Sequence, residues 1–391
     1  MPLRATPLAA LLLALATGTA AAAGMGDLRW RGQLDLVAAT RGSAFALNGL
    51  NRGDTQFDTY RLRLFAEGPV ADGIDVFTQI MMLEDLGVAV HGAYAMWTPL
   101  TGEDLHVIGG KIPWRIGTYA ERTYSHRNPL VGTPLMYQYH TSLRPDRLPP
   151  DADALAGAAG TGQSGPVYDA SGRGYRGMPI VYDRCWDFGV MLTGSARPLE
   201  YSAGFVNGTP GNPSAGNDRN SGRSWLGRLG AQPWPGVRAG VSASRGPWIG
   251  DTFAGQMPPG RTVNGYAQTL AMADLEWLFS TLELRGEGLW NEWQTPTAGD
   301  VDLHGGYLEA KIGLPSGAFA ASRWGVLKFG DVVDSTGAAR PWDHDVARVE
   351  AGIGYRVQRG AILKAVYQRT WFLRGLDRRE SLYALQAALA F

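Results

Sequence analysis

The chain has 391 residues, of which 45% are hydrophobic and only 18% are charged, with 36 basic residues balanced by 36 acidic residues. This balance gives no bias toward nucleic acid or anionic surfaces, and the single cysteine, Cys185, excludes an intrachain disulfide framework and cysteine-based zinc or haem motifs. The low charge, the 53 glycines and the 10% of aromatic residues are unusual for a soluble enzyme and suit many short strands joined by tight turns.

Residues 1–23 have the three parts of a secretory signal peptide. Arg4 precedes the apolar run "LAALLLALA", which is too short to span a bilayer, and a small-residue stretch follows up to Ala23. We therefore expect a signal peptide over 1–23 and a mature domain over 24–391 that leaves the cytoplasm. No later stretch holds about 18 consecutive apolar residues, which excludes a helical membrane protein.

Extended segments with alternating side-chain character recur along the whole mature domain. In the first, "DLRWRGQLDL", Leu28 and Trp30 lie on one face and Arg29 and Arg31 on the other, and the last ends with Phe391 on its apolar face. The expected strands are 27–36, 60–68, 74–84, 92–99, 104–112, 185–195, 199–207, 223–232, 236–245, 265–275, 279–290, 305–315, 318–328, 346–357, 360–371 and 381–391. This pattern predicts an all-β fold, a transmembrane antiparallel β-barrel of about 16 strands, because an even number closes a barrel with both termini on one side.

The connections between these strands alternate in length. Tight turns such as "GPVADG", "SARP" and "PSG" follow even-numbered strands, whereas longer polar or glycine-rich stretches such as "NGTPGNPSAGNDRNSGR" follow odd-numbered strands. Outer-membrane barrels have short periplasmic turns and longer extracellular loops, whereas a soluble sandwich has no such asymmetry. The alternation therefore supports the barrel independently of the strand pattern.

The connection over 113–184, between the fifth and sixth strands, is far longer than a passive link. Its first half is rich in Arg, His and Tyr, and its second half is small and glycine-rich, so we expect this third loop to fold into the lumen and constrict it. Charges at a narrow point act on a permeating ion at short range. The expected constriction residues are Arg115, Arg122, Arg127, His126, Tyr137, Tyr139, His140, Arg144 and Arg147.

Several stretches resemble the phosphate-selective porin O and P superfamily. They include "HVIGGKIPWRIGTYAERT", "DRCWDFGVMLTGSARPLEYSAGFVNGTP", "RLGAQPWPGVRAGVSASRG" and the closing Phe391. The resemblance implies a sixteen-stranded homotrimeric channel in the outer membrane of a Gram-negative bacterium. Its partners would be lipid, lipopolysaccharide and the barrel-assembly machinery, which would engage the C-terminal strand. The family's phosphate-selective members carry a dense run of basic residues along the pore, whereas the basic residues of this chain are mixed with acidic ones.

The alternation also places charged side chains on the inner wall of the expected barrel. The basic wall residues are Arg29, Arg31, Arg61, Arg63, Lys111, Arg285, Lys311, Arg323, Arg348 and Lys364, and the acidic ones are Asp35, Glu283, Glu287, Glu309 and Glu350. This excess predicts a water-filled diffusion channel for small hydrophilic solutes with a weak preference for anions. Pairing of these charges between neighbouring strands is the competing interpretation.

The sequence predicts neither an enzyme nor a cofactor, and the alternatives are few. A plugged structural or receptor-type barrel would carry the same strand pattern, and a barrel lipase would use His106 at the lipid interface with a Ser and an acid. "PWDHDV", which holds Asp343, His344 and Asp345, is a weak candidate for a surface metal, and a solvated loop is the simpler interpretation. Tyr124, with two tyrosines of the constriction set, offers a sliding surface for sugars or aromatic acids, although packing against the wall explains it as well.

Overall fold

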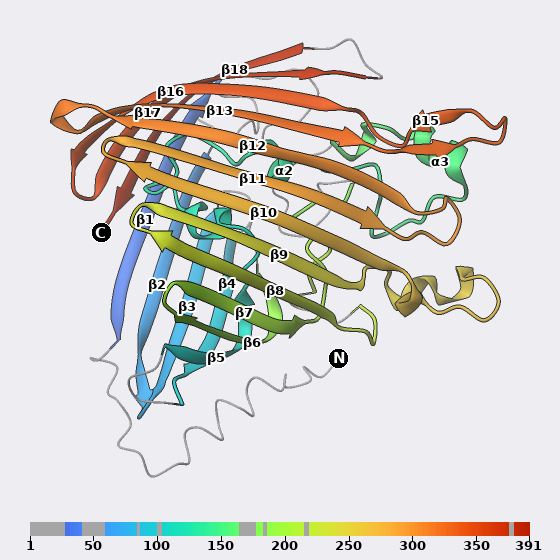
Figure 1. Cartoon of the computed structure of the whole chain (residues 1–391), viewed down its shortest axis with the longest axis horizontal. Helices are drawn as coiled ribbons and strands as arrows, with labels where there is room; N and C mark the ends of the chain where they lie inside the picture. The colour runs from blue at the N-terminus through green and yellow to red at the C-terminus, as the bar shows by residue number, and fades with distance from the viewer. Residues whose placement is uncertain are drawn as a thin grey trace.

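In the computed structural model, sixteen antiparallel strands close into one barrel, in which β1 pairs with both β2 and β18 (Figure 1). The structure describes residues 28–40, 59–83, 87–99, 104–163, 177–182, 186–214, 219–374 and 379–391. The expected signal peptide over 1–23 lies outside this part of the chain.

The barrel strands are β1 Arg29–Ala39, β2 Thr59–Ala71, β3 Ile74–Leu83, β4 Gly87–Trp97, β5 Leu105–Pro113, β6 Trp186–Ala196, β7 Leu199–Val206, β8 Ser224–Trp234, β9 Val237–Pro247, β10 Ala267–Phe279, β11 Leu282–Trp293, β12 Val301–Gly313, β13 Ala318–Phe329, β16 Val346–Gln358, β17 Ala361–Phe372 and β18 Arg379–Ala390. A separate two-stranded hairpin joins β13 to β16, in a stretch that the sequence analysis treated as a loop. Its strands are β14 Asp331–Val333 and β15 Ala339–Pro341.

The helices within the described residues are short and lie in connections. They are η2 Tyr119–Arg122, α2 Leu135–Gln138, α3 Ala152–Gly157, η3 Thr161–Gln163, η4 Asp251–Gln256, η5 Val263–Gly265 and η6 Pro315–Gly317. None of these helices has the length and apolar character needed to cross a membrane.

The predicted fold class is confirmed, since all sixteen expected strands form and their order around the barrel is sequential. The largest error is at β4, which begins at Gly87 instead of residue 92. A register shift between Gln79 and Ile80 of β3 leaves His91 as an extra residue on β4. Such a bulge breaks the period of two, so the first residues of β4 do not continue the pattern that follows.

The two ends of the barrel differ, as the connection lengths predict (Figure 1). We call the end that carries the short links after even-numbered strands the turn end, and the opposite end the loop end. One link departs from the prediction, because only residues 84–86 separate β3 from β4 at the loop end.

The closing residue of the chain completes the barrel seam. Gly32 N donates to the carbonyl oxygen of Phe391 at 2.7 Å, and Phe391 N donates to Gly32 O at 3.0 Å. A Cβ at position 32 would lie 2.2 Å from the phenylalanine ring, so glycine makes room for that ring. Tyr383, Leu385 and Phe391 are all at least 60% exposed, which confirms the outward apolar face predicted for the last strand.

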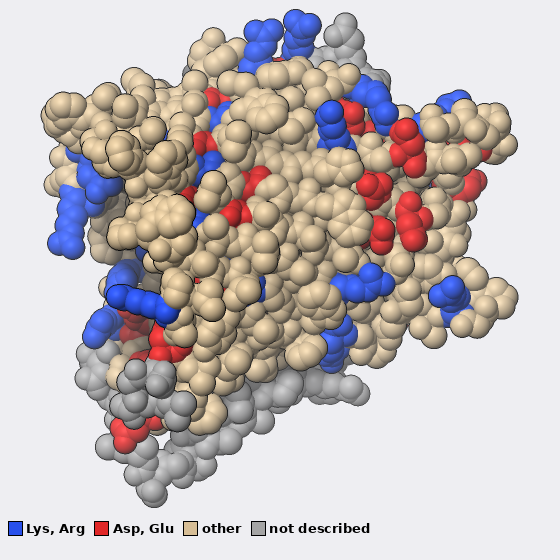
Figure 2. All heavy atoms as spheres, in the orientation of Figure 1, with Lys and Arg blue, Asp and Glu red and all other residues tan. Residues whose placement is uncertain are grey.

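Large apolar side chains cover the outside of the barrel. Exposed aromatic residues gather toward the turn end and again toward the loop end. On the face drawn in Figure 2, the wall between the two ends is mostly uncharged. The exposed aromatic residues near the turn end are Trp30, Trp97, Trp234, Trp277, Phe279, Tyr355 and Phe391, and those toward the loop end are Phe188, Phe205, Trp225, Trp290 and Tyr383, while Trp324 lies between the two groups. Two aromatic girdles that border an apolar band are the surface expected of a barrel in lipid.

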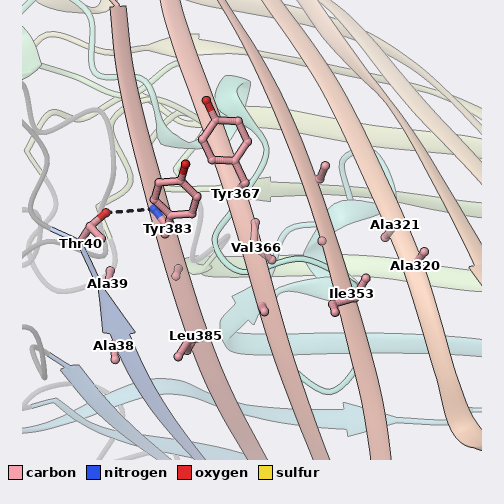
Figure 3. A pocket seen from close by; sticks show the side chains of 14 residues that line it. Ala38, Ala39, Thr40, Ala320, Ala321, Ile353, Val366, Tyr367, Tyr383 and Leu385 are labelled. Atoms are coloured by element: carbon pink, nitrogen blue, oxygen red, sulfur yellow. Dashed lines mark hydrogen bonds between the residues drawn. The ribbon is translucent and has the colours of Figure 1, made fainter.

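One stretch of this outer surface, on β13, β16, β17, β18 and β1, is a shallow apolar groove. Small residues such as Ala38 and Ala320 line it, and the rings of Tyr367 and Tyr383 lie 4.9 Å apart on neighbouring strands (Figure 3). Thr40 Oγ1 accepts a hydrogen bond of 3.0 Å from Tyr383 N at the groove edge.

Candidate functional site: the interior of the barrel

The connection between β5 and β6, described over residues 114–163 and 177–182 and called the segment below, lies against the inner face of the barrel wall. Its hydrogen bonds reach inward-facing side chains of β1, β2, β3, β9, β11, β12, β13, β16, β17 and β18. Among them are Gly117 N to Ser242 Oγ (3.0 Å), Tyr137 Oη to Glu287 Oε2 (2.8 Å), Arg61 Nη2 to Ser125 Oγ (3.1 Å), Arg323 Nη2 to Gly132 O (3.2 Å) and Lys364 Nζ to Ser125 O (2.5 Å). Partners on opposite sides of one cylinder require the segment to cross its interior (Figure 1).

Apolar packing holds the segment on one side of the interior. Trp114, Leu135 and Met136 of the segment are at most 1% exposed, and they belong to one cluster with wall residues that include Leu270 and Leu303. Sequence analysis expected a water-filled interior constricted by this loop and placed only charged residues on the inner wall. The difference arises because several strands carry apolar residues on their inner as well as their outer face, and the segment covers the inner ones.

Lys111 is a correction to the predicted pore wall. Its neighbours in the register are Ala93 and Phe188, and Phe188 is 37% exposed on the outside of the barrel. Ile108 and Ile112 of the same strand are buried inside, against the segment. The rule that charged residues face inward therefore fails on β5, and Lys111 Nζ instead donates to Val90 O at 2.7 Å.

On the inner face of β7 to β16, ion pairs link most of the charged side chains into one charge network. It runs from β7 to β16 and contains six acidic and six basic side chains, namely Glu200, Asp274, Glu276, Glu283, Glu309 and Glu350 with Arg122, Arg228, Arg238, Arg285, Lys311 and Arg323. The predicted basic excess is absent from this part of the wall, because the counted Arg285, Lys311 and Arg323 are matched by the counted Glu283, Glu309 and Glu350. The members that the wall list left out, three acidic and three basic, also balance. The pairing of charges between strands, which sequence analysis left open, describes this region.

Arg122 connects the segment to that network. Its Nη1 lies 2.6 Å from Glu309 Oε1 and its Nη2 donates to Tyr307 Oη at 2.6 Å, all within the buried interior. Although burial opposes the charged form, the Tyr307 hydroxyl and the Glu309 carboxylate raise the pKa of Arg122 above its ordinary value. Arg122 is therefore a fixed anchor and not a charge offered to passing ions.

Other predicted wall residues also hold the segment. Arg61 binds Asp35 through Nε and Nη2 at 3.0 and 2.9 Å, and Arg63 donates to Thr123 O at 3.2 Å. Arg348 is 1% exposed and donates to Gln138. Inward-facing basic residues here serve as hydrogen-bond donors to the segment, a role that position in the sequence alone does not show.

Tyr137, Tyr139 and His140 of the predicted constriction are buried in packing contacts. Tyr139 Oη donates to Asp343 Oδ1 at 2.8 Å, which ties the segment to the connection between β13 and β16. Burial lowers the pKa of His140 to about 4, so its imidazole is neutral at pH 7 while Nδ1 lies 2.8 Å from Gly177 O. These side chains position the segment and do not face open solvent.

Arg144 and Arg147 lie toward the loop end. Arg144 binds Asp146 through two hydrogen bonds of 2.8 and 2.7 Å, and the Asp146 side chain is 65% exposed. Nearby Pro149 O accepts from Thr297 in the connection between β11 and β12. The structure therefore separates this pair of arginines from the residues that meet β1 and β2.

The inner wall of β1 to β4 remains open to solvent toward the turn end, whereas Gln33 and Gln79, farther along β1 and β3, are buried beneath the segment. Arg31, which faces inward, has a 64% exposed side chain and binds Glu67 at 2.8 Å, and Glu67 itself is 29% exposed. Arg115, His126 and Arg127 of the segment are exposed as well. Burial and the charge of Arg127 lower the pKa of His126, whose Nδ1 lies 3.2 Å from the buried side chain of Gln33.

Aromatic wall residues that sequence analysis did not select border this open region. Phe65 and Phe77 face inward from β2 and β3, and Tyr94 from β4, where its ring stacks on Phe77 at 4.9 Å. Tyr124 of the segment meets Phe65 edge to face at 5.5 Å. The alternation of side chains along β2 could have identified Phe65, since it lies on the same face as Arg61 and Arg63, which were assigned to the pore wall.

His106 does not lie at the lipid interface that a barrel lipase would need. It faces inward at the turn end, paired in register with the buried Thr193. Its ring nitrogens lie 2.9 Å from Thr98 Oγ1 and 2.9 Å from Asp104 Oδ1, and Asp104 also accepts from Ser195. Within the described residues no group of three or more potential metal ligands is present, and Asp343 and Asp345 of the weak metal candidate at 343–345 accept hydrogen bonds from Tyr139 and Phe329.

Comparison with solved structures places this arrangement among known barrels. An anion-selective porin from Comamonas acidovorans aligns with a TM-score of 0.57 at 10% identity, over 93% of this chain and 99% of that one. The chain has the porin fold. Salmonella typhi OmpF in complex with daunomycin (0.57, 12% identity, 93% and 97% covered) and the outer membrane channel DcaP of Acinetobacter baumannii (0.54, 8%, 93% and 97%) align similarly.

No family model matches the chain, and no curated protein matches its sequence. The phosphate-selective porin superfamily therefore stays a prediction, while the wider porin fold is shown.

Proposed function

We propose that this protein is an outer-membrane porin, a water-filled diffusion channel for small hydrophilic solutes that carries out no chemistry. The observation that carries the proposal is the uneven interior. Leu270 and Leu303, behind the segment, are 0% exposed, whereas Arg31, Arg115 and Arg127 are exposed inside the same closed wall. Charged side chains that face inward and still reach solvent favour a water-filled path along β1 to β4.

We further propose that the channel conducts anions slightly better than cations. Its exposed charged side chains are mostly basic, while Glu67 is paired with Arg31 and the charge network on the opposite wall is balanced. Fixed positive charge where a pore is narrow lowers the barrier to anions. We therefore place selectivity on Arg115, His126 and Arg127, a smaller set than sequence analysis selected.

Location and assembly follow the same proposal. The exposed apolar band and its aromatic girdles favour insertion into the outer membrane, in contact with lipid and lipopolysaccharide. The seam between Gly32 and Phe391 suits delivery of the last strand by the barrel-assembly machinery. We propose a homotrimer, which cross-linking of the protein in native membranes would test.

The proposal is tested by recording reversal potentials of the purified protein in a planar bilayer under a salt gradient. We expect stable conductance steps and a weak anion preference. Arg115→Glu combined with Arg127→Glu should reverse the preference, whereas Arg144→Glu, at the loop end, should leave it nearly unchanged. A cation preference of the unmodified protein would contradict the anion assignment.

A second candidate function is a plugged barrel that acts as a receptor or structural protein. The observation that favours it is the apolar packing of Trp114, Leu135 and Met136 inside the barrel. A folded, inserted protein that shows no conductance at all would support this alternative and overturn the channel.

A further inference from the structure

We propose that the open side of the interior binds aromatic monocarboxylates, which makes them the preferred solutes of the channel. This inference rests on the proposed channel function and adds a substrate class to it. It is carried by an aromatic strip, defined as Phe65, Phe77, Tyr94 and Tyr124, that lies inside the barrel beside exposed arginines.

The strip is continuous across three neighbouring strands and the segment. Register pairs Phe77 with Tyr94, and Phe65 with Gln79, which is two residues from Phe77 on the same face. Tyr124 Oη donates to Gln79 Oε1 at 3.1 Å, which holds its ring between the two halves of the strip. The rings therefore form one surface instead of four separate packing contacts.

Each ring of the strip keeps part of its surface accessible. All four residues are half-buried, and the inward faces of the three wall residues Phe65, Phe77 and Tyr94 can be reached only from the interior of the barrel. Tyr137 and Tyr139, by contrast, are at most 2% exposed. A planar ring can pack on the accessible faces and edges of the strip in the offset or edge-to-face geometry that aromatic pairs prefer.

Basic groups border the strip at a distance that suits a short anionic side group. Arg63, which is itself buried, lies 5.1 Å from the Tyr124 ring centroid, and Arg115 of the segment is exposed. Arg31 is paired in register with Phe65 and is 64% exposed. A guanidinium binds a carboxylate with two parallel hydrogen bonds, and a ring attached to that carboxylate would then meet the strip.

The chemistry separates this ligand class from the alternatives. A simple inorganic anion would use Arg31 and Arg115 without the rings, and a neutral sugar would use the rings without the arginines. Only a solute with both a planar apolar part and a negative charge uses both features. One carboxylate is preferred over two, because Glu67 and Asp75 also face inward on β2 and β3.

The experiment measures how benzoate and acetate, two monovalent carboxylates, change the chloride current through the protein in a planar bilayer. We expect benzoate to reduce the current saturably at a concentration at least about 10-fold lower than acetate. Tyr124→Ala and Phe65→Ala should each weaken the benzoate effect about 3- to 10-fold, the change in binding that loss of one ring contact gives.

Matched variants separate the ring from other effects. Tyr124→Phe keeps the ring and should retain benzoate binding, and Tyr367→Ala removes a ring from the outer face and should change nothing. Arg115→Gln should weaken benzoate while conductance persists. A protein that conducts but responds equally to benzoate and acetate would overturn this inference and leave the channel standing, whereas a folded protein without any current would overturn the channel itself.

Discussion

At the scale of single residues, the basic side chains of the interior divide into two roles. Arg122 and Arg323 are buried and hold the segment through fixed partners, whereas Arg115 and Arg127 are exposed. Burial with a carboxylate partner removes a charge from contact with solutes, so residue type and position do not identify a selectivity residue. We propose that exposure of a basic side chain on the inner face of the barrel is the feature that marks a selectivity residue.

Arg122→Ala tests the anchoring role. Removing one partner of a buried ion pair costs about 3 kcal/mol when, as here, Glu309 keeps Arg323 at 3.2 Å. We expect faster hydrogen exchange in residues 114–148 and a larger single-channel conductance, because the segment is less firmly held. Arg144→Ala, which removes an exposed pair, should cost about 0–1 kcal/mol and leave both measurements unchanged.

His126 gives the channel a dependence on pH. Burial and neighbouring positive charge lower its pKa below the ordinary value of 6.5, so the ring is neutral at pH 7 and gains its proton only as the pH falls below that value. The added charge should strengthen anion preference at acidic pH. Reversal potentials from pH 7.5 to pH 4.5 measure this, and His126→Gln should remove most of the change. An anion preference that falls on acidification would contradict the assignment.

At the scale of elements, strands were predictable and the segment inside the barrel was not. Alternation of side chains is a local property, so β18 could be assigned with its outward face, while the bulge at His91 displaced β4. The contacts of Arg122 with Glu309 join residues far apart in the sequence, and no spacing rule gives them. Lys111 was assigned to the inner face for the same reason. The inner face of β5 carries apolar residues because the segment covers it, and this long-range contact cannot be seen in the local pattern.

Asp343 links the segment to the connection between β13 and β16 at the loop end. Its oxygens accept from Tyr139 Oη, Ser142 N, Gly160 N and His344 N at 2.6 to 2.8 Å. Asp343→Asn replaces one acceptor oxygen by an NH2 group, which leaves donors of the segment without an acceptor. We expect each unsatisfied donor to lower the local stability of the segment by about 1–3 kcal/mol.

Hydrogen exchange should become faster across 139–160 while the barrel strands stay protected. Asp331→Asn, at an exposed ion pair with Arg374, is the control and should leave exchange unchanged. Uniform loss of protection in all strands would show that Asp343 stabilises the whole barrel instead of this link.

At the scale of the whole molecule, the account requires the outer apolar band to face lipid. Leu308, in the middle of β12, is 65% exposed, and Leu314, just beyond the end of that strand, is 47% exposed. Leu308→Arg should cost about 2–4 kcal/mol in folding into lipid vesicles, and Leu314→Arg only about 0–1 kcal/mol, because the cost depends on depth. Equal costs at both positions, measured by denaturant titration, would contradict a membrane-spanning wall.

The central claim is that water passes along β1 to β4 and not behind the segment. In a Cys185→Ser background, Glu67→Cys, Arg127→Cys and Leu270→Cys proteins are exposed to a charged thiol reagent while current is recorded. The account predicts rapid modification and a reduced current for the first two, and no modification at position 270. Modification at 270 with protection at 127 would place the water on the opposite side and contradict the account.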